Sequence, residues 1–473
     1  MQLIDALRTD DTQTLNGMPA HSTTLNACVD LFSSIGAMRG QDKNSVINLF
    51  TKAFDEDATT AMRILFWSRD VRGGAGERQI FKDIINYLGL YRPEALSKVV
   101  TLIPEYGRWD DLFALFGTKV EDSALDCIIK GLNSGNQLCA KWCPRPNTKN
   151  PKDKAVALAI RKRMKLSPKE YRQLLVANTN VVEQLMCAKK WSEIEYSKVP
   201  SKAMSDYMAT FSKRDINRYS EYLNSVTKGE ATINTGAVYP YNVVNALRNG
   251  DVMAANTMWS NLPDYMTENN ERLLPVVDVS GSMDDPAGGS KSVSCMDVAI
   301  SLGLYISERN VGEFKDAFIT FSSEPTLQYV KGTLQERYNQ MATSRWSMNT
   351  NLEKVFGLIL SKAKAFNLTE DEMPSMVLIL SDMQFDSGIR YNDNAYRMMT
   401  KQYEEAGYRV PKIVYWNIKD YGNKPIQSHQ TGASLVSGFS PALLTSILSG
   451  ETLSPIRMML KVVNAERYSP ITV

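Results

Sequence analysis

The stretch LLPVVDVSGS, residues 273–282, decides the fold of the C-terminal part of the chain. It opens with an uninterrupted apolar run, which is typical of a strand buried on both faces of a sheet. Similar runs recur and alternate with segments of helical spacing. Strands are predicted at 273–279, 316–321, 376–380 and 412–417, and helices at 295–309, 333–342, 351–366 and 394–406. This alternation predicts a doubly wound, Rossmann-like α/β domain with a parallel sheet.

The N-terminal half has a different pattern. From about residue 20 to 230, apolar residues recur at helical spacing, and Gly- and Pro-containing segments end each helix after about ten to fifteen residues. Ser167, Pro168 and Glu170 are typical of an N-cap, a first-turn proline and a capping-box acid. Many short helices in series favour an α-solenoid, although no strict sequence period is present. We therefore expect two domains, a helical one over 1–262 and an α/β one over 263–473.

The composition excludes several classes of protein. With 43% hydrophobic and 22% charged residues, and no run of eighteen apolar positions, the chain is typical of a globular rather than a membrane or disordered protein. Its N-terminus lacks the pattern of a secretory signal, so a cytoplasmic location is expected. Six scattered cysteines do not form a disulfide framework, and Cys139 and Cys143 are more readily explained by buried packing than by zinc. Two distant histidines, His21 and His429, argue against histidine-based hydrolysis.

A candidate metal site follows the first strand. Asp278, Ser280 and Ser282 lie two residues apart where the chain leaves the sheet, the edge at which open α/β folds bind ligands. Carboxylate and hydroxyl oxygens suit Mg²⁺, and also Mn²⁺ or Ca²⁺. Thr350 at the start of a predicted helix and Asp382 at the end of another strand supply further oxygens. The alternative is a strand-to-helix turn stabilised by Asx and Ser caps alone.

These five residues, in this order, resemble the metal-ion-dependent adhesion site of von Willebrand factor A domains. The resemblance implies that Ser280, Ser282 and Thr350 bind the cation through hydroxyl oxygens, while Asp278 and Asp382 hold it directly or through water. Two departures concern ligand choice: Asn351 stands where related sequences often carry an acid, and the segment DDPAGGSKS lengthens the following loop. Such sites bind a partner's carboxylate without catalysis, and no residue here is marked as a general base. We therefore expect a binding protein and not an enzyme.

A basic stretch provides the second candidate site. Residues 141–220 contain 18 Lys and Arg against 7 Asp and Glu, although the whole chain carries only +2. Such a surface can bind the phosphates of RNA, and aromatic residues such as Trp142 and Tyr171 lie among the cations. The alternative is a solvated face that keeps a solenoid soluble. The candidate RNA-binding residues are Arg145, Lys149, Lys152, Lys154, Arg161, Lys162, Arg163, Lys165, Lys169, Arg172, Lys189, Lys190, Lys213, Arg214 and Arg218.

The turn RDVRGGAGER, residues 69–78, is a third candidate, for an anion. Arg69, Arg72 and Arg78 surround three glycines before a predicted helix, where free backbone N–H groups can hold an anion. The turn lacks the GK[ST] ending of a P-loop, so a structural turn that needs positive φ is the favoured interpretation. Arg108 and Trp109 nearby could stack on a base, but Trp109 is better explained as a packing residue between repeats.

Helical repeats followed by an A domain, together with WSRDVRGGAGERQIFKDI, IPEYGRWDDLFAL and RKRMKLSPKEYRQLL, resemble Ro ribonucleoproteins, the TROVE family. The resemblance spans nearly the whole chain. It implies HEAT-type repeats that curl into a ring closed by the A domain, and binding of single-stranded or misfolded RNA; it leaves open whether the ring forms here. The alternative is a metal-dependent protein–protein scaffold, and a cation-dependent nuclease ranks third. No membrane association is expected, and the sequence specifies no oligomeric state.

Overall fold

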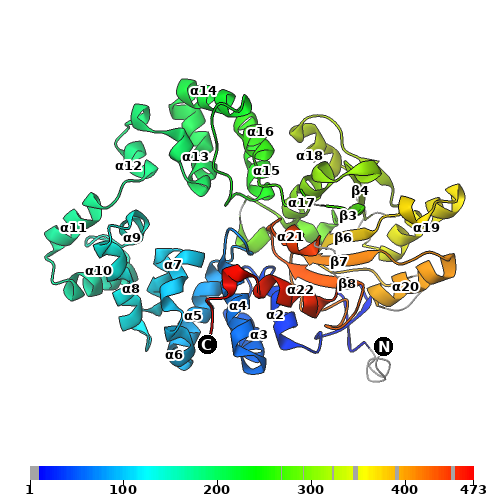
Figure 1. Cartoon of the computed structure of the whole chain (residues 1–473), viewed down its shortest axis with the longest axis horizontal. Coiled ribbons are helices and arrows are strands. Elements are labelled where there is room, and N and C mark those ends of the chain that lie inside the picture. Colours follow the sequence, from blue (N-terminus) through cyan, green and yellow to red (C-terminus); the bar gives the residue numbers. More distant parts are fainter. Residues whose placement is uncertain are drawn as a thin grey trace. The chain divides into compact units, whose positions relative to one another are not determined.

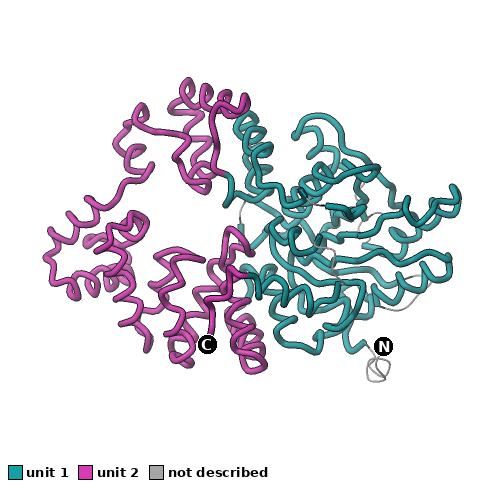
Figure 2. The backbone as a smooth tube through the Cα atoms, viewed as in Figure 1, with its two compact units in different colours: residues 1–41, 235–465 teal, residues 42–234, 466–473 magenta. Residues whose placement is uncertain are grey.

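The structure is a computed structural model that describes residues 10–267, 269–290, 292–321, 324–344, 350–388, 394–448 and 453–473. The chain forms two compact units, coloured separately in Figure 2. We call residues 1–41 and 235–465 the α/β unit, and residues 42–234 and 466–473 the helical unit. The chain therefore combines an N-terminal helical region with a C-terminal sheet covered by helices, as the sequence predicts. The units do not follow a single cut at residue 262, because each contains two separate segments of chain.

The α/β unit is built on a six-stranded sheet in the order β5-β4-β3-β6-β7-β8. Its strands are β3 (Leu273–Val277), β4 (Ala317–Thr320), β5 (Leu327–Tyr329), β6 (Met376–Ser381), β7 (Lys412–Asn417) and β8 (Ala433–Ser437). All neighbours are parallel except β5, which pairs antiparallel with β4 at one edge. Counted within the sheet, the order is 3-2-1-4-5-6, that of an open doubly wound sheet. The four predicted strands are present, whereas β5 and β8 are additional.

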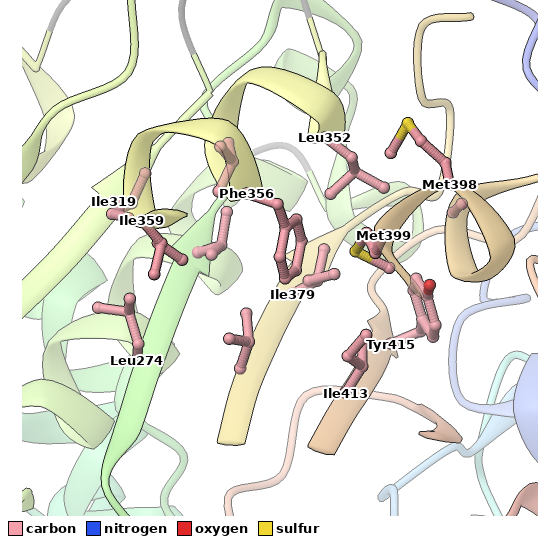
Figure 3. Close-up of a cluster of buried hydrophobic side chains, with 14 of the residues drawn as sticks. Leu274, Ile319, Leu352, Phe356, Ile359, Ile379, Met398, Met399, Ile413 and Tyr415 are labelled. Carbon is pink, nitrogen blue, oxygen red and sulfur yellow. The ribbon is translucent and has the colours of Figure 1, made fainter. Parts of the chain in front are cut away.

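Both faces of this sheet are covered. One face carries alternate residues of successive strands, such as Leu274, Ile319, Ile379 and Tyr415, which pack against Phe356 and the other apolar residues of two helices (Figure 3). These helices are α19 (Leu352–Phe366) and α20 (Ala395–Ala406). On the other face, α17 (Cys295–Arg309) contacts β3, β4 and β6, and α2 (Ala27–Ile35) and α22 (Pro455–Val463) contact β8. Double coverage explains why β3, β4, β6 and β8 are buried at every position.

The remaining elements of the α/β unit lie before the sheet, between its strands or, in the case of α21, after its last strand (Figure 1). Short strands β1 (Thr12–Gln13) and β2 (Pro19–Ala20) form an antiparallel pair, and we call residues 12–20 the N-terminal hairpin. The helices are α15 (Pro240–Arg248), α16 (Val252–Ser260), α18 (Leu334–Ala342) and α21 (Leu443–Ile447), with 3₁₀ segments η5 (Gly281–Asp284), η6 (Ala287–Gly289), η7 (Gly312–Phe314) and η8 (Glu370–Glu372).

Helices α15 and α16 were expected in the N-terminal domain but belong to the α/β unit. Arg248 of α15 pairs with Asp297 of α17 at 2.6 Å, and the indole of Trp259 in α16 donates a 2.8 Å hydrogen bond to Glu308. Helical spacing shows that a segment has an apolar face, but it does not show which neighbour covers that face. The position of α15 and α16 could therefore not be derived from the pattern change near residue 272.

The helical unit consists of short helices separated by turns. They are α3 (Lys43–Glu56), α4 (Ala58–Arg69), α5 (Gln79–Tyr91), α6 (Pro93–Ser97), α7 (Ile103–Tyr106), α8 (Glu121–Asn133), α9 (Gln137–Trp142), α10 (Pro151–Arg163), α11 (Pro168–Ala177), α12 (Val182–Cys187), α13 (Ser201–Arg214) and α14 (Ile216–Thr227). The 3₁₀ segments η1 (Val100–Leu102), η2 (Trp109–Leu115), η3 (Trp191–Glu193) and η4 (Tyr196–Lys198) lie between these helices, and η9 (Glu466–Tyr468) belongs to the segment 466–473.

Local signals explain where several of these helices begin. Ser167 and Glu170 form the predicted capping box at the start of α11, with Pro168 in its first turn. Successive elements contact each other, as α3 with α4, α8 with α9 and α13 with α14. No helix in the described parts of the chain is both long and apolar enough to cross a membrane.

Candidate functional site

The two predicted aspartates lie at the carboxyl ends of neighbouring strands. In the β3–β6 pair, Val277 is in register with Leu380, and the backbone N–H of Asp278 donates a 2.9 Å hydrogen bond to the Leu380 carbonyl. Asp278 therefore lies beside Ser381, and Asp382 follows directly. Residues 278 and 382, more than one hundred positions apart in sequence, are brought together because both end central strands of one parallel sheet.

Asp278 is a buried acid with ordered hydrogen bonds. Its side chain accepts a 2.9 Å bond from the Ser280 backbone N–H and a 2.6 Å bond from the Ser381 hydroxyl. It is fully buried, and burial is the main reason why its pKa is raised to about 6, with the nearby Asp382 carboxyl raising it further. The hydrogen bonds from Ser280 and Ser381 lower the pKa and only partly oppose this rise. The site thus concentrates negative charge in a place that water reaches poorly.

Asp382 is buried as well, and half of its carboxylate has no partner. Its Oδ1 atom accepts a 3.1 Å hydrogen bond from the Gln384 backbone N–H. Its Oδ2 atom has no hydrogen-bond partner among the described residues. Burial raises the pKa of Asp382, while the Ser282 hydroxyl opposes the rise. An unpartnered carboxylate oxygen in the interior is costly unless a cation or a proton satisfies it.

Serine hydroxyls lie beside the two acids. The Oγ atoms of Ser280 and Ser282 are 3.1 Å apart at the start of η5. Thr350 is buried directly before α19, and its backbone carbonyl accepts a 3.0 Å hydrogen bond from Asp386, four residues after Asp382. Thr350 is therefore tied to the loop that follows β6. Asn351, which departs from the adhesion-site pattern, is the N-cap of α19 and accepts a hydrogen bond from the Lys354 backbone N–H.

The residues of this site fit a hard divalent cation. Two carboxylates, one with a free oxygen, and nearby hydroxyls form an oxygen donor set of the kind that Mg²⁺ and Ca²⁺ prefer. No three His, Cys, Asp or Glu side chains gather as a metal cluster in the described residues. Cation binding would therefore depend on serine and threonine oxygens and on water in addition to the two acids. Asp284 is exposed and lies outside this donor set.

The sequence reasoning missed a cation at the rim of the site. The Lys419 ammonium, in the loop after β7, forms an ion pair with Asp285 and a 2.6 Å hydrogen bond with the Tyr421 hydroxyl. It also lowers the pKa of Asp382 through its charge. Lys419 thus provides a positive charge within electrostatic reach of Asp382. Nothing in the spacing around residue 419 marks it, because its position depends on how β7 ends beside β6.

A polar pocket of about 440 Å³ lies next to the serine loop. Asp284 and Pro286 from that loop form part of its wall. Arg248, Asp297 and Tyr338 form another part, and the Tyr338 hydroxyl donates a 3.0 Å hydrogen bond to Asp297. The pocket is large enough for the side chains of a ligand bound at the loop.

The predicted RNA-binding residues lie on helices α10, α11, α13 and α14 and in the turns that follow α9, α10 and α12. Most of them are exposed, and within the described chain most make no ion pair. Arg163, which pairs with Asp122 and Asp126, Arg218, which pairs with Asp215, and Lys190 are the exceptions. The residues that are exposed and carry no ion pair are Lys149, Lys152, Lys154, Lys162, Lys165, Lys169, Arg172, Lys189, Lys213 and Arg214.

Two of these lysines have an unusual backbone conformation. Lys165 and Lys189 adopt positive φ, both 57°, directly after α10 and α12. The residue after each one closes the helix end, since the N–H groups of Leu166 and Lys190 bond to the carbonyls of Arg161 and Leu185. Glycine normally occupies this position in a helix end because it adopts positive φ without strain.

The glycine-rich turn is held by its own hydrogen bonds. The backbone N–H groups of Gly74, Ala75 and Gly76 bond to carbonyls of Trp67 and Asp70, and a Cβ atom on Gly74 would lie 1.8 Å from the Trp67 carbonyl oxygen. Arg69 is buried and pairs with Asp111 at 2.7 Å, and Arg78 pairs with Asp110. Arg72 is exposed. These contacts favour the structural interpretation of the turn over an anion site.

The aromatic and cysteine candidates of the helical unit have packing partners. The Arg108 guanidinium lies 4.0 Å from the centre of the Trp142 ring, and the Trp109 ring contacts Gly131. Cys139 and Cys143 are buried, and the Cys139 thiol donates a 3.5 Å hydrogen bond to the Ile128 carbonyl.

Comparison with known proteins gives similarity over the whole chain. The domain of unknown function DUF7788 matches residues 273–467, which contain all five candidate metal ligands. The domain of unknown function DUF2828 matches residues 14–134 and 148–277. The chain is also 31% identical over 521 residues to the uncharacterized protein L728 of Acanthamoeba polyphaga mimivirus, with 97% of this chain and 88% of that protein covered. Since the DUF2828 matches cover more than half of the sequence, the chain belongs to the DUF2828 family.

Proposed function

We propose that the α/β unit is a von Willebrand factor A-type domain that binds a divalent cation, and through it a ligand, without catalysis. The observation that carries the proposal is the buried pair Asp278 and Asp382, with one carboxylate oxygen that no described group satisfies. The strand order and the antiparallel edge strand support the same type of domain. The resemblance of the five ligand positions is the third argument.

The protein side of such a site has a clear division of roles. Ser280, Ser282 and Thr350 would offer hydroxyl oxygens, and Asp278 and Asp382 would supply the negative charge directly or through water. Mg²⁺, Mn²⁺ or Ca²⁺ would neutralise the two acids and retain a coordination position for an oxygen of a ligand. A carboxylate from a protein partner suits that position, and the adjacent polar pocket would hold neighbouring side chains of the partner.

The double substitution Ser280→Ala with Ser282→Ala tests this proposal. The wild-type chain should gain thermal stability with Mg²⁺ or Mn²⁺, because a ligand that binds only the folded state stabilises it. The double variant should fold and lose this gain, since only two small hydroxyls are removed. Ser361→Ala, on exposed α19 surface, is the control and should retain the full gain. An unchanged cation-dependent shift in the double variant would exclude the site.

We further propose that the helical unit, as a HEAT-like solenoid of Ro type, binds single-stranded or misfolded RNA. The supporting observation is the set of exposed Lys and Arg side chains on and between α10 to α14 that form no ion pair with a described residue. Uncompensated cations attract phosphates, and binding to them weakens as salt rises. The alternative remains a protein scaffold, in which the basic face contacts acidic protein or solvent.

Binding of a labelled single-stranded RNA over a range of salt concentrations, with Mg²⁺ and with EDTA, distinguishes the two functions. RNA binding that is steep in salt and survives EDTA supports the Ro-type function. Lys162→Glu with Lys165→Glu should weaken binding and flatten the salt slope. Lys52→Glu with Lys98→Glu makes the same charge change elsewhere in the helical unit and serves as the control. No RNA binding by the wild-type chain, with cation-dependent capture of a protein, would favour the scaffold.

A further inference from the structure

The N-terminal hairpin is bonded to the loop that carries Asp382. The Thr14 hydroxyl donates a 2.6 Å hydrogen bond to the Phe385 carbonyl, and the Asn16 side-chain amide donates a 2.8 Å bond to the Gln384 carbonyl. Gly17 forms an isolated β-bridge with Asp386. Residues more than 350 positions apart thus run beside each other, and the hairpin covers the segment that begins directly after the candidate ligand.

Gln384 is the centre of these contacts. Its side-chain oxygen accepts a 2.7 Å hydrogen bond from the Leu15 backbone N–H. Its amide nitrogen donates a 2.7 Å bond to Asn423, from the segment after β7, and a longer one of 3.3 Å to the Asp382 carbonyl. The Gln384 backbone N–H is also the donor to the Asp382 carboxylate. This buried side chain therefore links Asp382 to both the hairpin and the next strand connection.

The backbone between Asp382 and Gln384 needs such support. Met383 is buried at a positive φ of 64°, a left-handed conformation that is strained for a residue with a side chain. The Ser381 hydroxyl accepts from the Met383 N–H at 3.0 Å, and the Asn423 amide donates to the Met383 carbonyl at 3.2 Å. A strained residue persists only where its surroundings fix it. Here the surroundings include the hairpin contacts of Gln384.

The same loop reaches the third part of the donor set. Asp386, which bridges to Gly17, donates its backbone N–H to the Thr350 carbonyl. The Ser387 N–H donates to the Asn16 carbonyl at 3.3 Å. The hairpin, the Asp382 loop and the Thr350 loop therefore form one hydrogen-bonded structure. A loosened hairpin would release both Asp382 and Thr350 from their positions.

We infer that Gln384 and the N-terminal hairpin are positioning elements of the cation site, which hold Asp382 and Thr350 in place for a small, hard cation. The inference rests on the proposed cation-binding function. Groups that orient metal ligands typically contribute 10- to 100-fold to metal affinity. Mg²⁺ requires near-ideal octahedral geometry, whereas Ca²⁺ accepts irregular geometry, so the support matters more for Mg²⁺.

The test is calorimetric titration of the full chain with Mg²⁺ and with Ca²⁺. Gln384→Met retains the side-chain length but removes its hydrogen bonds, and we expect Mg²⁺ affinity to fall about 10-fold or more, with a smaller fall for Ca²⁺. The matched control is Gln340→Met in α18, whose side-chain amide exchanges two hydrogen bonds with the Lys331 backbone. That control should leave both affinities unchanged. A merely structural role of Gln384 would lower thermal stability without changing the Mg²⁺-to-Ca²⁺ preference.

Asn16→Ala provides a second variant that does not disturb the core, because Asn16 is exposed. It should weaken Mg²⁺ binding in the same direction by a smaller factor. If Gln384→Met retains the wild-type Mg²⁺ affinity and the wild-type preference for Mg²⁺ over Ca²⁺, the inference is overturned and the cation site stands. If Gln384→Met does not fold, the same result in Asn16→Ala overturns the inference. A wild-type chain that binds neither cation would overturn the proposed function and this inference with it.

Discussion

The Ser381 hydroxyl donates a 2.6 Å hydrogen bond to the Asp278 carboxylate across the β3–β6 pair. Ser381 is the last residue of β6, and the acid that follows it, Asp382, is the second candidate ligand. The end of β6 therefore acts on the ionised form of Asp278 in two opposite ways. The Ser381 hydroxyl stabilises this form, and the Asp382 carboxylate destabilises it. Burial has a larger effect on the pKa of Asp278 than the hydrogen bonds have, since this pKa is raised to about 6.

Cation stabilisation of the protein should depend on pH. A free aspartate has a pKa of about 3.9, so between about pH 4 and pH 6 folded Asp278 binds a proton that the unfolded chain does not. The free-energy cost of burying the charged Asp278 carboxylate applies in full above its pKa in the folded state, about 6. This cost disappears as the pH falls toward the pKa of the same group in the unfolded chain. A cation competes with that proton. We expect the Mg²⁺-induced rise in melting temperature to be large at about pH 7.5 and small at about pH 5. Equal rises at both pH values would contradict the prediction.

Removal of the Lys419 charge should strengthen cation binding. The Lys419 ammonium repels a metal cation that binds near Asp382. The partners of this ammonium, Asp285 and Tyr421, are at the surface. We expect Lys419→Met to increase Mg²⁺ affinity on the order of two- to five-fold at low salt, with a smaller effect at high salt. Lys362→Met, an exposed lysine of α19, is the control and should have no effect. Weaker Mg²⁺ binding in Lys419→Met would instead mean that Lys419 supports the site.

Lys165→Gly should stabilise the helical unit and weaken RNA binding. Glycine relieves the strain of positive φ at the end of α10, a gain of about 0.5–1 kcal/mol after its greater freedom in the unfolded chain is included. The same change removes an exposed cation from the proposed RNA surface. Urea unfolding and RNA titration of one variant measure both effects. Stabilisation with unchanged RNA affinity would place Lys165 outside the interface.

Arg69→Met should strongly destabilise the helical unit. Arg69 is buried and pairs with Asp111, a fully buried acid that would lose its closest cation, although Lys82 lies 3.4 Å from its other oxygen. Loss of one partner of a buried pair costs about 3–5 kcal/mol, and we expect the lower end because Lys82 remains. The exposed Arg72→Met is the control and should change the free energy of unfolding by about 0.5 kcal/mol or less. Similar stability of the two variants would mean that the Arg69–Asp111 pair contributes little to the stability of the helical unit.

Local patterns predicted the central part of the α/β unit. The predicted helix at 295–309 and strand at 412–417 have the bounds of α17 and β7, because a continuous apolar run and a capped helix are properties of the local sequence. Strands β5 and β8 were not predicted. The burial of β8 depends on α2 and α22, which are distant in sequence, and β5 is a short, partly exposed edge strand.

The sequence also predicted the candidate ligands but not their support. Asp278 and Asp382 follow apolar runs, and the parallel sheet brings such positions to one edge. Ser381 was within reach of the same reasoning, since it directly precedes Asp382 in MVLILSD. Gln384 was not, because its role depends on the hairpin near residue 15 and on Asn423. Contacts between distant segments leave no periodic signal in either segment.

The order of segments along the chain has a consequence for biosynthesis. The α/β unit takes residues 1–41 from the beginning of the chain, and the helical unit takes residues 466–473 from its end. In the helical unit, Arg467 and Tyr468 bond to the buried Asp70. A ribosome therefore releases residues 235–465 of the α/β unit only after the whole of residues 42–234, and residues 466–473 of the helical unit only after residues 235–465. A single cut of the chain would yield neither unit intact.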